Sequence, residues 1–170
     1  MIASGEFRQA MGRFATGVTV VTTQQDDGTI TGLTANAFSA LSLDPPLILV
    51  CVGYNAGSYA VLRQAERFVV HILAADQTEV ARCFASSGAD KASCGQWQVS
   101  ARGNPVLEGC LAVIECRRSA EHEGGDHAIL IGAVEATSFP ADDAAPLTYY
   151  RGQLNALGRI DGGAVAGAGK

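Results

Sequence analysis

The chain has 170 residues, of which 48% are hydrophobic and 17% are charged. This length and composition predict one folded domain with a substantial core and exclude an intrinsically disordered chain. The net charge is −5 and the longest basic run is Arg117-Arg118, which excludes a broad nucleic-acid-binding surface.

The N-terminal third predicts a helix followed by a β-hairpin and a strand. Residues 6–14 carry apolar side chains at helical spacing, namely Phe7, Ala10, Met11 and Phe14. Gly17 ends this helix, and the β-branched residues 18–23 with the turn QQDDGT predict a hairpin over residues 17–35. Residues 47–52 follow two prolines as an unbroken apolar run, which is typical of a strand buried on both faces.

The middle of the chain predicts a short helix over residues 57–65 and a strand over residues 67–73. Asp76 is a candidate N-cap for a further helix over residues 77–85. Residues 86–106 are rich in Gly, Ser, Asp, Asn and Lys, so we expect a long irregular segment, which in a compact domain often carries function.

The C-terminal part predicts strands over residues 112–119, 127–137 and 147–150, the first two joined by the hairpin loop EHEGGD. Six or seven strands with three short helices and mostly hairpin connections predict a mainly antiparallel β-barrel with helices packed outside. We expect this domain to span residues 1–157 and residues 158–170 to form a flexible Gly/Ala tail. The N-terminus lacks a signal-peptide pattern and no apolar run is long enough for a membrane span, so we expect a cytoplasmic protein.

The five cysteines include no C-x-x-C pair. Cys110 and Cys116 lie on one predicted strand, roughly 20 Å apart at the rise of an extended chain, which is too far for a disulfide. We therefore expect reduced cysteines that act as small hydrophobic residues, with Cys94 in an exposed loop.

Several common catalytic patterns are missing. There is no P-loop, no Rossmann G-x-G-x-x-G sequence and no G-x-S-x-G nucleophile elbow. His122, Asp126 and His127 cluster around two glycines in a hairpin loop, but no further ligand has suitable spacing, so we expect no metal site. His71 lies in an apolar strand and is expected to be a core histidine.

Residues 31–52 contain polar side chains at short intervals beside a core strand, namely Thr34, Asn36, Ser39 and Ser42. Buried polar groups need hydrogen-bond partners, so either the backbone or a ligand satisfies them. Gly53 then precedes the helix predicted over residues 57–65 and Ser58 lies in its first turn, where a phosphate could bind. Composition supports a ligand here without identifying it.

The order of four segments resembles the short-chain flavin reductases, which supply reduced flavin to two-component flavin monooxygenases. These segments are FATGVTVVTT, GLTANAFSALSLDPPLILVCV, EGGDHAILIGAVEA and PLTYYRGQL, and the resemblance covers roughly residues 6–157. It implies an FMN-binding split β-barrel, a homodimer with the flavin near the subunit interface, FMN or FAD with NADH or NADPH, and a separate monooxygenase as partner.

The resemblance also implies roles for individual residues. The flavin ring would rest on the segment containing Thr34, Ala35, Asn36, Ala37 and Ser39. The ribityl chain and phosphate would lie toward Ser42, Cys51, Val52, Gly53 and Ser58. The rest of the nucleotide would be covered by Phe84, Ala85, Asp90 and Lys91. His127 would lie at the nicotinamide side, and Tyr150 with Arg151 matches a recurring aromatic-basic pair.

This chain departs from the family pattern at two positions. Ala92 stands where a large aromatic usually follows the Asp-Lys pair, and Phe38 is bulky beside the predicted ring site. Two other functions remain open from the residues alone. One is a non-catalytic flavin-binding protein, and the other is a split-barrel flavoenzyme that keeps its flavin and reduces another acceptor.

Overall fold

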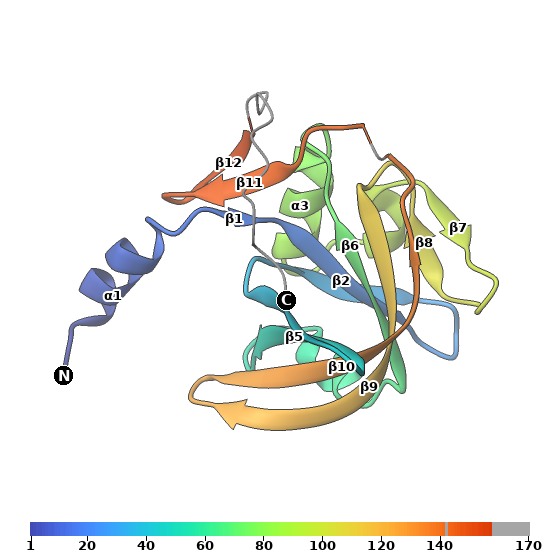
Figure 1. Cartoon of the computed structure of the whole chain (residues 1–170), viewed down its shortest axis with the longest axis horizontal. Helices are drawn as coiled ribbons and strands as arrows, with labels where there is room; N and C mark the ends of the chain where they lie inside the picture. The colour runs from blue at the N-terminus through green and yellow to red at the C-terminus, as the bar shows by residue number, and fades with distance from the viewer. Residues whose placement is uncertain (142, 158–170) are drawn as a thin grey trace.

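Antiparallel strands dominate the computed structural model, which describes residues 1–141 and 143–157 (Figure 1). The predicted tail from residue 158 therefore lies outside the described residues. The strands are β1 (Thr16–Gly17), β2 (Thr19–Gln24), β3 (Ile30–Ala35), β4 (Phe38–Leu43), β5 (Pro46–Gly53), β6 (Arg67–Ile72), β7 (Trp97–Val99), β8 (Pro105–Leu107), β9 (Ala112–Gly124), β10 (His127–Ser138), β11 (Leu147–Tyr150) and β12 (Gln153–Ala156). The helices are α1 (Ser4–Met11), α2 (Tyr59–Leu62), α3 (Thr78–Ala85) and the 3-10 helix η1 (Lys91–Cys94). In the described residues, no helix combines the length and the apolar character that a membrane span requires.

Seven strands form one curved sheet in the order β3-β2-β6-β9-β10-β5-β4, and every pairing in it is antiparallel. The edge strands β3 and β4 are consecutive in the chain but are not paired with each other. The sheet therefore curls into a barrel that stays open where residues 36 and 37 connect its two edges. A small sheet of β1, β11 and β12 and the hairpin β7-β8 lie beside it. The predicted antiparallel split barrel is confirmed.

Strand β2 is buried on both faces because it separates two clusters of apolar side chains. Val21 packs into the barrel interior with Val50 and Phe68. On the other face, Val20 belongs to a cluster that includes Phe84 of α3. This second cluster holds α3 against the barrel, and α3 forms one wall of the candidate site described below.

The prediction that the strand at residues 47–52 is buried on both faces is wrong. Burial alternates along β5, and the buried side chains are Ile48, Val50 and Val52. The intervening Leu49 and Cys51 are only half-buried, because that face of the sheet has no second layer over it. An apolar run can therefore mark a strand with one face in the core and one apolar face left partly uncovered.

The helices begin or end at other residues than predicted. Gln77, not Asp76, is the N-cap residue of α3, and it makes no side-chain cap hydrogen bond. The helix predicted over residues 57–65 shortens to α2, and α1 begins and ends earlier than predicted and has no buried residue. Figure 1 shows α1 projecting away from the barrel, so the expectation that all helices pack outside the barrel is wrong for α1.

Three segments were not predicted as strands. Strand β4 was missed because polar residues interrupt its apolar pattern, and β12 because it follows a turn directly. The segment over residues 86–106, predicted to be irregular, contains η1 and the hairpin β7-β8. The loop predicted as EHEGGD shortens to a two-residue turn, because β9 continues to Gly124.

The expectation that every cysteine is reduced is wrong for two of the five. Cys83 in α3 and Cys94 in η1 form a disulfide with their Cα atoms 6.1 Å apart. Both cysteines lie next to the segment that was predicted as irregular, so the sequence did not indicate that η1 returns to α3. The other three, Cys51, Cys110 and Cys116, are free as predicted.

His71 is a buried core histidine, as predicted, and its imidazole makes the stability of the fold depend on pH. Its Nδ1 lies 3.1 Å from the carbonyl oxygen of Val20, whereas its Nε2 has no hydrogen-bond partner in the described residues. Burial lowers the pKa of His71 from 6.5 to about 4, although the carbonyls of Val20 and Pro105 and the carboxylate of Glu115 act in the opposite direction. The folded protein therefore keeps the neutral imidazole where the unfolded chain would protonate it.

We expect the contribution of His71 to the free energy of unfolding to be complete above pH 6.5. This contribution should disappear as the pH falls toward 4, because the unfolded chain then binds a proton that the folded protein does not. The difference amounts to about 3 kcal/mol in the free energy of unfolding at most, and urea titrations across this pH range would measure it. His71→Asn keeps an N–H donor for Val20 but does not titrate, so its stability should fall less over the same range. Parallel pH profiles for the variant and the wild type would contradict this role of His71.

Candidate functional site

Three surface hollows meet at the open side of the barrel. We name them the Thr34 cavity, of about 690 Å³, the Ser58 cavity, of about 400 Å³, and the Cys51 cavity, of about 440 Å³. Ala85 lines both the Thr34 and the Ser58 cavities, and Asn36 lines both the Thr34 and the Cys51 cavities. The three hollows are therefore neighbours along β3, the connection to β4, and α3, and we refer to them together as the groove.

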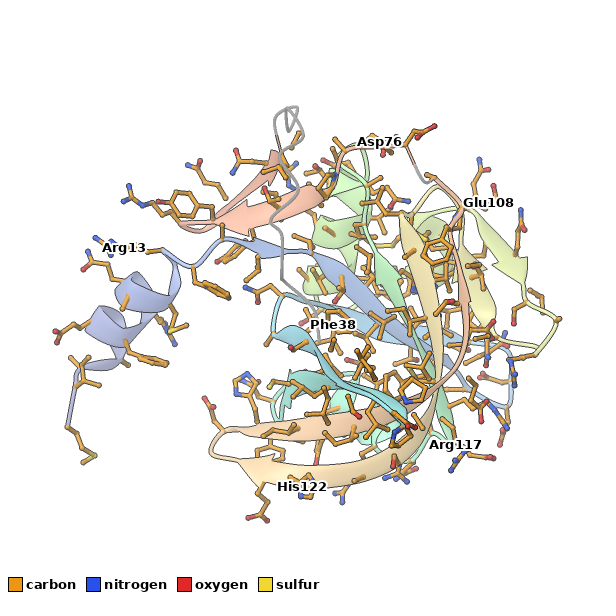
Figure 2. The ribbon with its side chains drawn as sticks, in the orientation of Figure 1. Arg13, Phe38, Asp76, Glu108, Arg117 and His122 are labelled. Atoms are coloured by element: carbon orange, nitrogen blue, oxygen red, sulfur yellow. A yellow bond between two sulfur atoms is a disulfide. The ribbon has the colours of Figure 1, made fainter. Side chains whose placement is uncertain are left out.

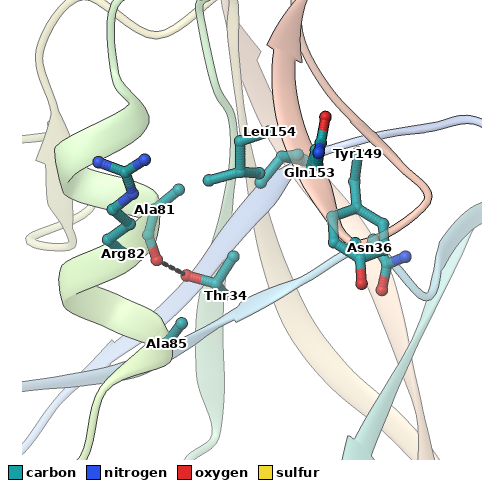
Figure 3. A pocket seen from close by; sticks show the side chains of 10 residues that line it. Thr34, Asn36, Ala81, Arg82, Ala85, Tyr149, Gln153 and Leu154 are labelled. Atoms are coloured by element: carbon teal, nitrogen blue, oxygen red, sulfur yellow. Dashed lines mark hydrogen bonds between the residues drawn. The ribbon is translucent and has the colours of Figure 1, made fainter.

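The Thr34 cavity lies between β3, α3 and the β11-β12 hairpin (Figure 3). The hydroxyl of Thr34 donates a 2.6 Å hydrogen bond to the carbonyl of Ala81 in α3 (Figure 3). The backbone thus satisfies Thr34, which ties the two walls together. The side chain of Asn36 is exposed and makes no hydrogen bond in the described part of the chain, so its amide can bind a ligand.

The Ser58 cavity collects the end of α3, the loop over residues 84–91, and the segment that leads into α2. Lys91 Nζ donates to the carbonyl oxygens of Cys83 and Ser86, each at 2.7 Å. The Lys91 ammonium therefore caps the C-terminal end of α3, and burial lowers the pKa of Lys91. Asp90 caps η1 by accepting a hydrogen bond from the amide of Ala92 at 3.1 Å.

Of the three cavities, the Cys51 cavity has the largest share of apolar side chains in its lining. Its lining includes the large apolar side chains of Met11, Phe14 and Phe38. The predicted site residues that also line it are Asn36, Ala37, Ser39 and Cys51. The hydroxyl of Ser39 donates to the carbonyl of Ala40 at 2.9 Å, so the backbone satisfies it. Burial raises the pKa of the Cys51 thiol, which keeps it a neutral, small side chain.

His127 lies at the start of β10, opposite Gly53 at the end of β5. Its Nδ1 is 2.6 Å from Oδ1 of Asp126, and this hydrogen bond lowers the pKa of the Asp126 carboxyl. A Cβ atom at Gly53 would lie 3.6 Å from Nε2 of His127 and 3.0 Å from Oδ1 of Asn55, so glycine leaves space beside the imidazole. His122 is exposed on the outer edge of the same hairpin (Figure 2).

Seven residues predicted for the site line none of these three cavities, namely Ala35, Ser42, Val52, Gly53, His127, Tyr150 and Arg151. The side chains of Ala35 and Val52 are buried in the core, so these residues can offer only backbone atoms. Ser42 is half-buried on β4, outside the groove. Arg151 has its guanidinium 5.2 Å from the ring centre of Tyr150, and Arg151 lines a separate hollow beside α1.

Tyr149 and Arg82 are among the residues that line the Thr34 cavity but were not predicted for the site. Tyr149, and not its neighbour Tyr150, lines this cavity, and Arg82 lies on the opposite wall, paired with Glu79 at 2.6 Å. Strand alternation could have identified Tyr149, because it shares a face with the buried Leu147, two residues earlier. Arg82 carried no comparable signal, since its place depends on how α3 packs.

Small side chains make up much of the lining of the groove, so backbone groups and small polar side chains are the main groups it offers a ligand. Within residues 1–141 and 143–157, no group of three His, Cys, Asp or Glu side chains could hold a metal ion. His127 and Asp126 form an imidazole-carboxylate pair that lines none of the three hollows, but Gly53 separates it from Asn55, which lines the Ser58 cavity. This donor set can bind and orient a ligand, but it contains no activated nucleophile.

Comparison with known proteins identifies the family to which this sequence is similar. The model of the flavin reductase like domain matches residues 11–158. In Mycobacterium tuberculosis, the reductase subunit HsaB of a flavin-dependent monooxygenase is 40% identical over 152 residues, covering 89% of this chain and 81% of the relative. An NADH-dependent flavin reductase from a Rhodococcus species is 41% identical over 153 residues, covering 88% of this chain and 84% of the relative.

A solved structure shares the fold as well as the sequence pattern. It is the NADH:FAD oxidoreductase SgcE6 of Streptomyces globisporus in complex with NAD and FAD fragments. The TM-score is 0.83 at 34% identity, and the match covers 89% of this chain and 90% of that one.

Proposed function

The chain belongs to the flavin reductase like domain family and is a flavin reductase, and we propose that it uses NADH to reduce FMN or FAD and releases the product to a separate monooxygenase. The observation that carries the proposal is the groove of three neighbouring hollows that share Asn36 and Ala85 as lining residues. Small side chains make up much of its lining, and the charged side chains of Arg82 and Lys91 in it are engaged by Glu79 and by the carbonyl of Cys83. Such a groove favours a flavin that binds and leaves.

The residues of this chain would hold and orient the two nucleotides. When flavin is bound, the flavin ring itself supplies the hydride chemistry. The Thr34 hydroxyl holds β3 against α3 by its hydrogen bond to the carbonyl of Ala81, so it is not free for a ligand. The side-chain amide of Asn36 is the group that would bind the ligand. The main contribution of the protein is to hold the two rings in contact and exclude water between them.

The loop over residues 84–91 would cover the nucleotide, with Lys91 and Asp90 serving first to order the loop itself. This explains why Ala92 can replace a large aromatic residue. The loop is held by its own hydrogen bonds, so its position does not require an aromatic anchor at residue 92.

The first test is NADH oxidation with and without added FMN, FAD or riboflavin, followed by ultrafiltration of the mixture. We expect saturable turnover only with flavin present, and most of the flavin should pass the membrane. Flavin retained without turnover would indicate a non-catalytic flavin-binding protein. Retained flavin with turnover only on another acceptor would indicate a flavoenzyme of a different specificity.

We also propose a homodimer, because several large apolar side chains on the described surface are exposed. Met11 and Phe14 at the end of α1 are 50% and 67% exposed, and both line the Cys51 cavity. Leu43 at the end of β4 is 82% exposed. A second copy of the chain would bury these side chains and complete the apolar side of the groove.

Light scattering should therefore give twice the monomer mass of 17.6 kDa. Phe14→Asp should shift the protein toward monomer and weaken flavin binding together, because the cavity loses its cover. Val99→Asp is the matched control, since Val99 is 75% exposed on β7, away from α1. A monomeric wild-type protein would contradict the proposal.

A further inference from the structure

The Cys83–Cys94 disulfide has no part in the proposed function, yet it lies at the edge of the groove. Cys83 belongs to the last turn of α3, and Cys94 is the last residue of η1. Their Cα separation of 6.1 Å is within the range that a disulfide spans. Both residues are half-buried, so small oxidants and reductants can reach them.

The segment between these two cysteines is the loop that lines the Ser58 cavity. It carries Phe84, Ala85, Asp90 and Lys91, which are the residues proposed to cover the nucleotide. The disulfide joins the two ends of this segment, 11 positions apart in the sequence. Its formation or reduction therefore changes how firmly the base of the loop is closed.

The fold can accommodate the dithiol form without losing the loop. In that form, Cys94 Sγ can donate to the carbonyl of Asp90, 3.1 Å away. Lys91 still binds the end of α3, and Nε1 of Trp97 still donates to the carbonyl of Ala92 at 3.1 Å. The two redox forms should therefore share one fold and differ in the order of the loop.

We propose that Cys83 and Cys94 are a reversible redox pair that controls flavin release from the groove. The inference rests on the proposed function, because free reduced flavin that meets oxygen generates the oxidant. Dioxygen takes two electrons and two protons from the flavin and becomes hydrogen peroxide. The disulfide holds the loop over the nucleotide, slows its release, and so limits further peroxide formation.

Oxidation of the pair needs hydrogen peroxide as its only oxidant, and the reverse step needs a dithiol reductant. One thiolate attacks a peroxide oxygen, which breaks the O–O bond and gives a sulfenic acid and hydroxide. The second thiolate attacks the sulfenic sulfur, forms the S–S bond and expels a second hydroxide. Overall, two thiols and hydrogen peroxide give one disulfide and two waters. A dithiol reductant reverses the step by thiol–disulfide exchange and is itself oxidised to a disulfide.

The pair can be tested first without flavin, by counting thiols in the whole chain. After treatment with hydrogen peroxide, unfolding and alkylation, mass spectrometry should find three modified cysteines, and after treatment with dithiothreitol it should find five. Tryptic cleavage after Lys91 should be slower in the oxidised protein, because the loop is closed at its base. Five modified cysteines after peroxide treatment would overturn the proposal.

Flavin titration of the same two samples tests the control of release. We expect the oxidised protein to bind FMN or FAD about tenfold more tightly, because a loop ordered in advance loses less freedom on binding. Cys83→Ser and Cys94→Ser should each match the reduced wild type under both conditions. Cys110→Ala is the matched control and should keep the full redox response, since Cys110 is buried away from the loop.

Equal flavin affinities for the oxidised and reduced wild type would overturn the control of release, even if the disulfide forms. Failure of the proposed function would look different. Flavin would then bind in neither redox state, and this would remove the control of release as well. The thiol count and the cleavage rate would still decide whether the pair is redox-active.

Discussion

Gly32→Ala is expected to destabilise the protein by about 3 kcal/mol or more. Gly32 lies in β3, opposite Thr22 of β2. A methyl group at this position would overlap the carbonyl oxygen of Val21 and lie 3.1 Å from Cα of Thr22. Backbone atoms of a fully buried strand cannot move aside without breaking strand pairing, so the strain falls on the β2-β3 hairpin itself.

The measurement is the urea midpoint at one protein concentration, because a dimer would make the apparent stability depend on concentration. Gly17→Ala is the matched control. Gly17 also lies in a strand, but no atom is within 4 Å of the added Cβ position, so its stability should change by less than about 1 kcal/mol. Equal midpoints for Gly32→Ala and the wild type would show that β3 can shift away from β2.

His127→Ala is expected to raise the KM for NADH about tenfold to a hundredfold, while the flavin Kd stays near the wild-type value. The Asp126 carboxylate accepts a hydrogen bond from Nδ1–H of His127, so Nε2 keeps its lone pair for a ligand. We propose that this lone pair would accept a hydrogen bond from the nicotinamide carboxamide when NADH is bound. Its loss weakens the binding of NADH without removing the flavin site along Thr34 and Asn36.

Steady-state kinetics with NADH varied at saturating flavin would measure this effect. His122→Ala is the control, because His122 lies on the same hairpin but pairs opposite Ile129, away from Gly53. It should leave both kcat and KM unchanged. The role of His127 would be refuted by a variant with wild-type kinetics, although the family assignment would stand.

The sequence predicted the pattern of strands well where each strand has one consistent environment. The hairpin over residues 17–35 and the strands at residues 67–73 and 127–137 are present because apolar and β-branched residues dominate them. The strand β4 was missed because its residues have mixed exposure. Its pairing with β5 across a tight turn, not its own composition, makes it a strand.

The sequence predicted which segments form the candidate site, but it did not predict the directions of their side chains. The polar residues at 34, 36 and 39 looked equivalent in the sequence. In the structure, Thr34 and Ser39 bind the backbone, and Asn36 remains available to a ligand. The choice of Tyr150 over Tyr149 followed the family pattern, whereas strand alternation points Tyr149 into the Thr34 cavity.

By itself, the sequence determined the antiparallel barrel, the family, and the segments that gather at the open side of the barrel. These depend on local patterns and on the order of motifs, both of which can be read along the chain. Only the tertiary structure decided that α3 forms a wall of the groove beside Thr34, that Arg82 faces the same cavity, and that Cys94 returns to Cys83. Each of these contacts joins residues whose separation in space is set by packing between elements, and no local pattern encodes that distance.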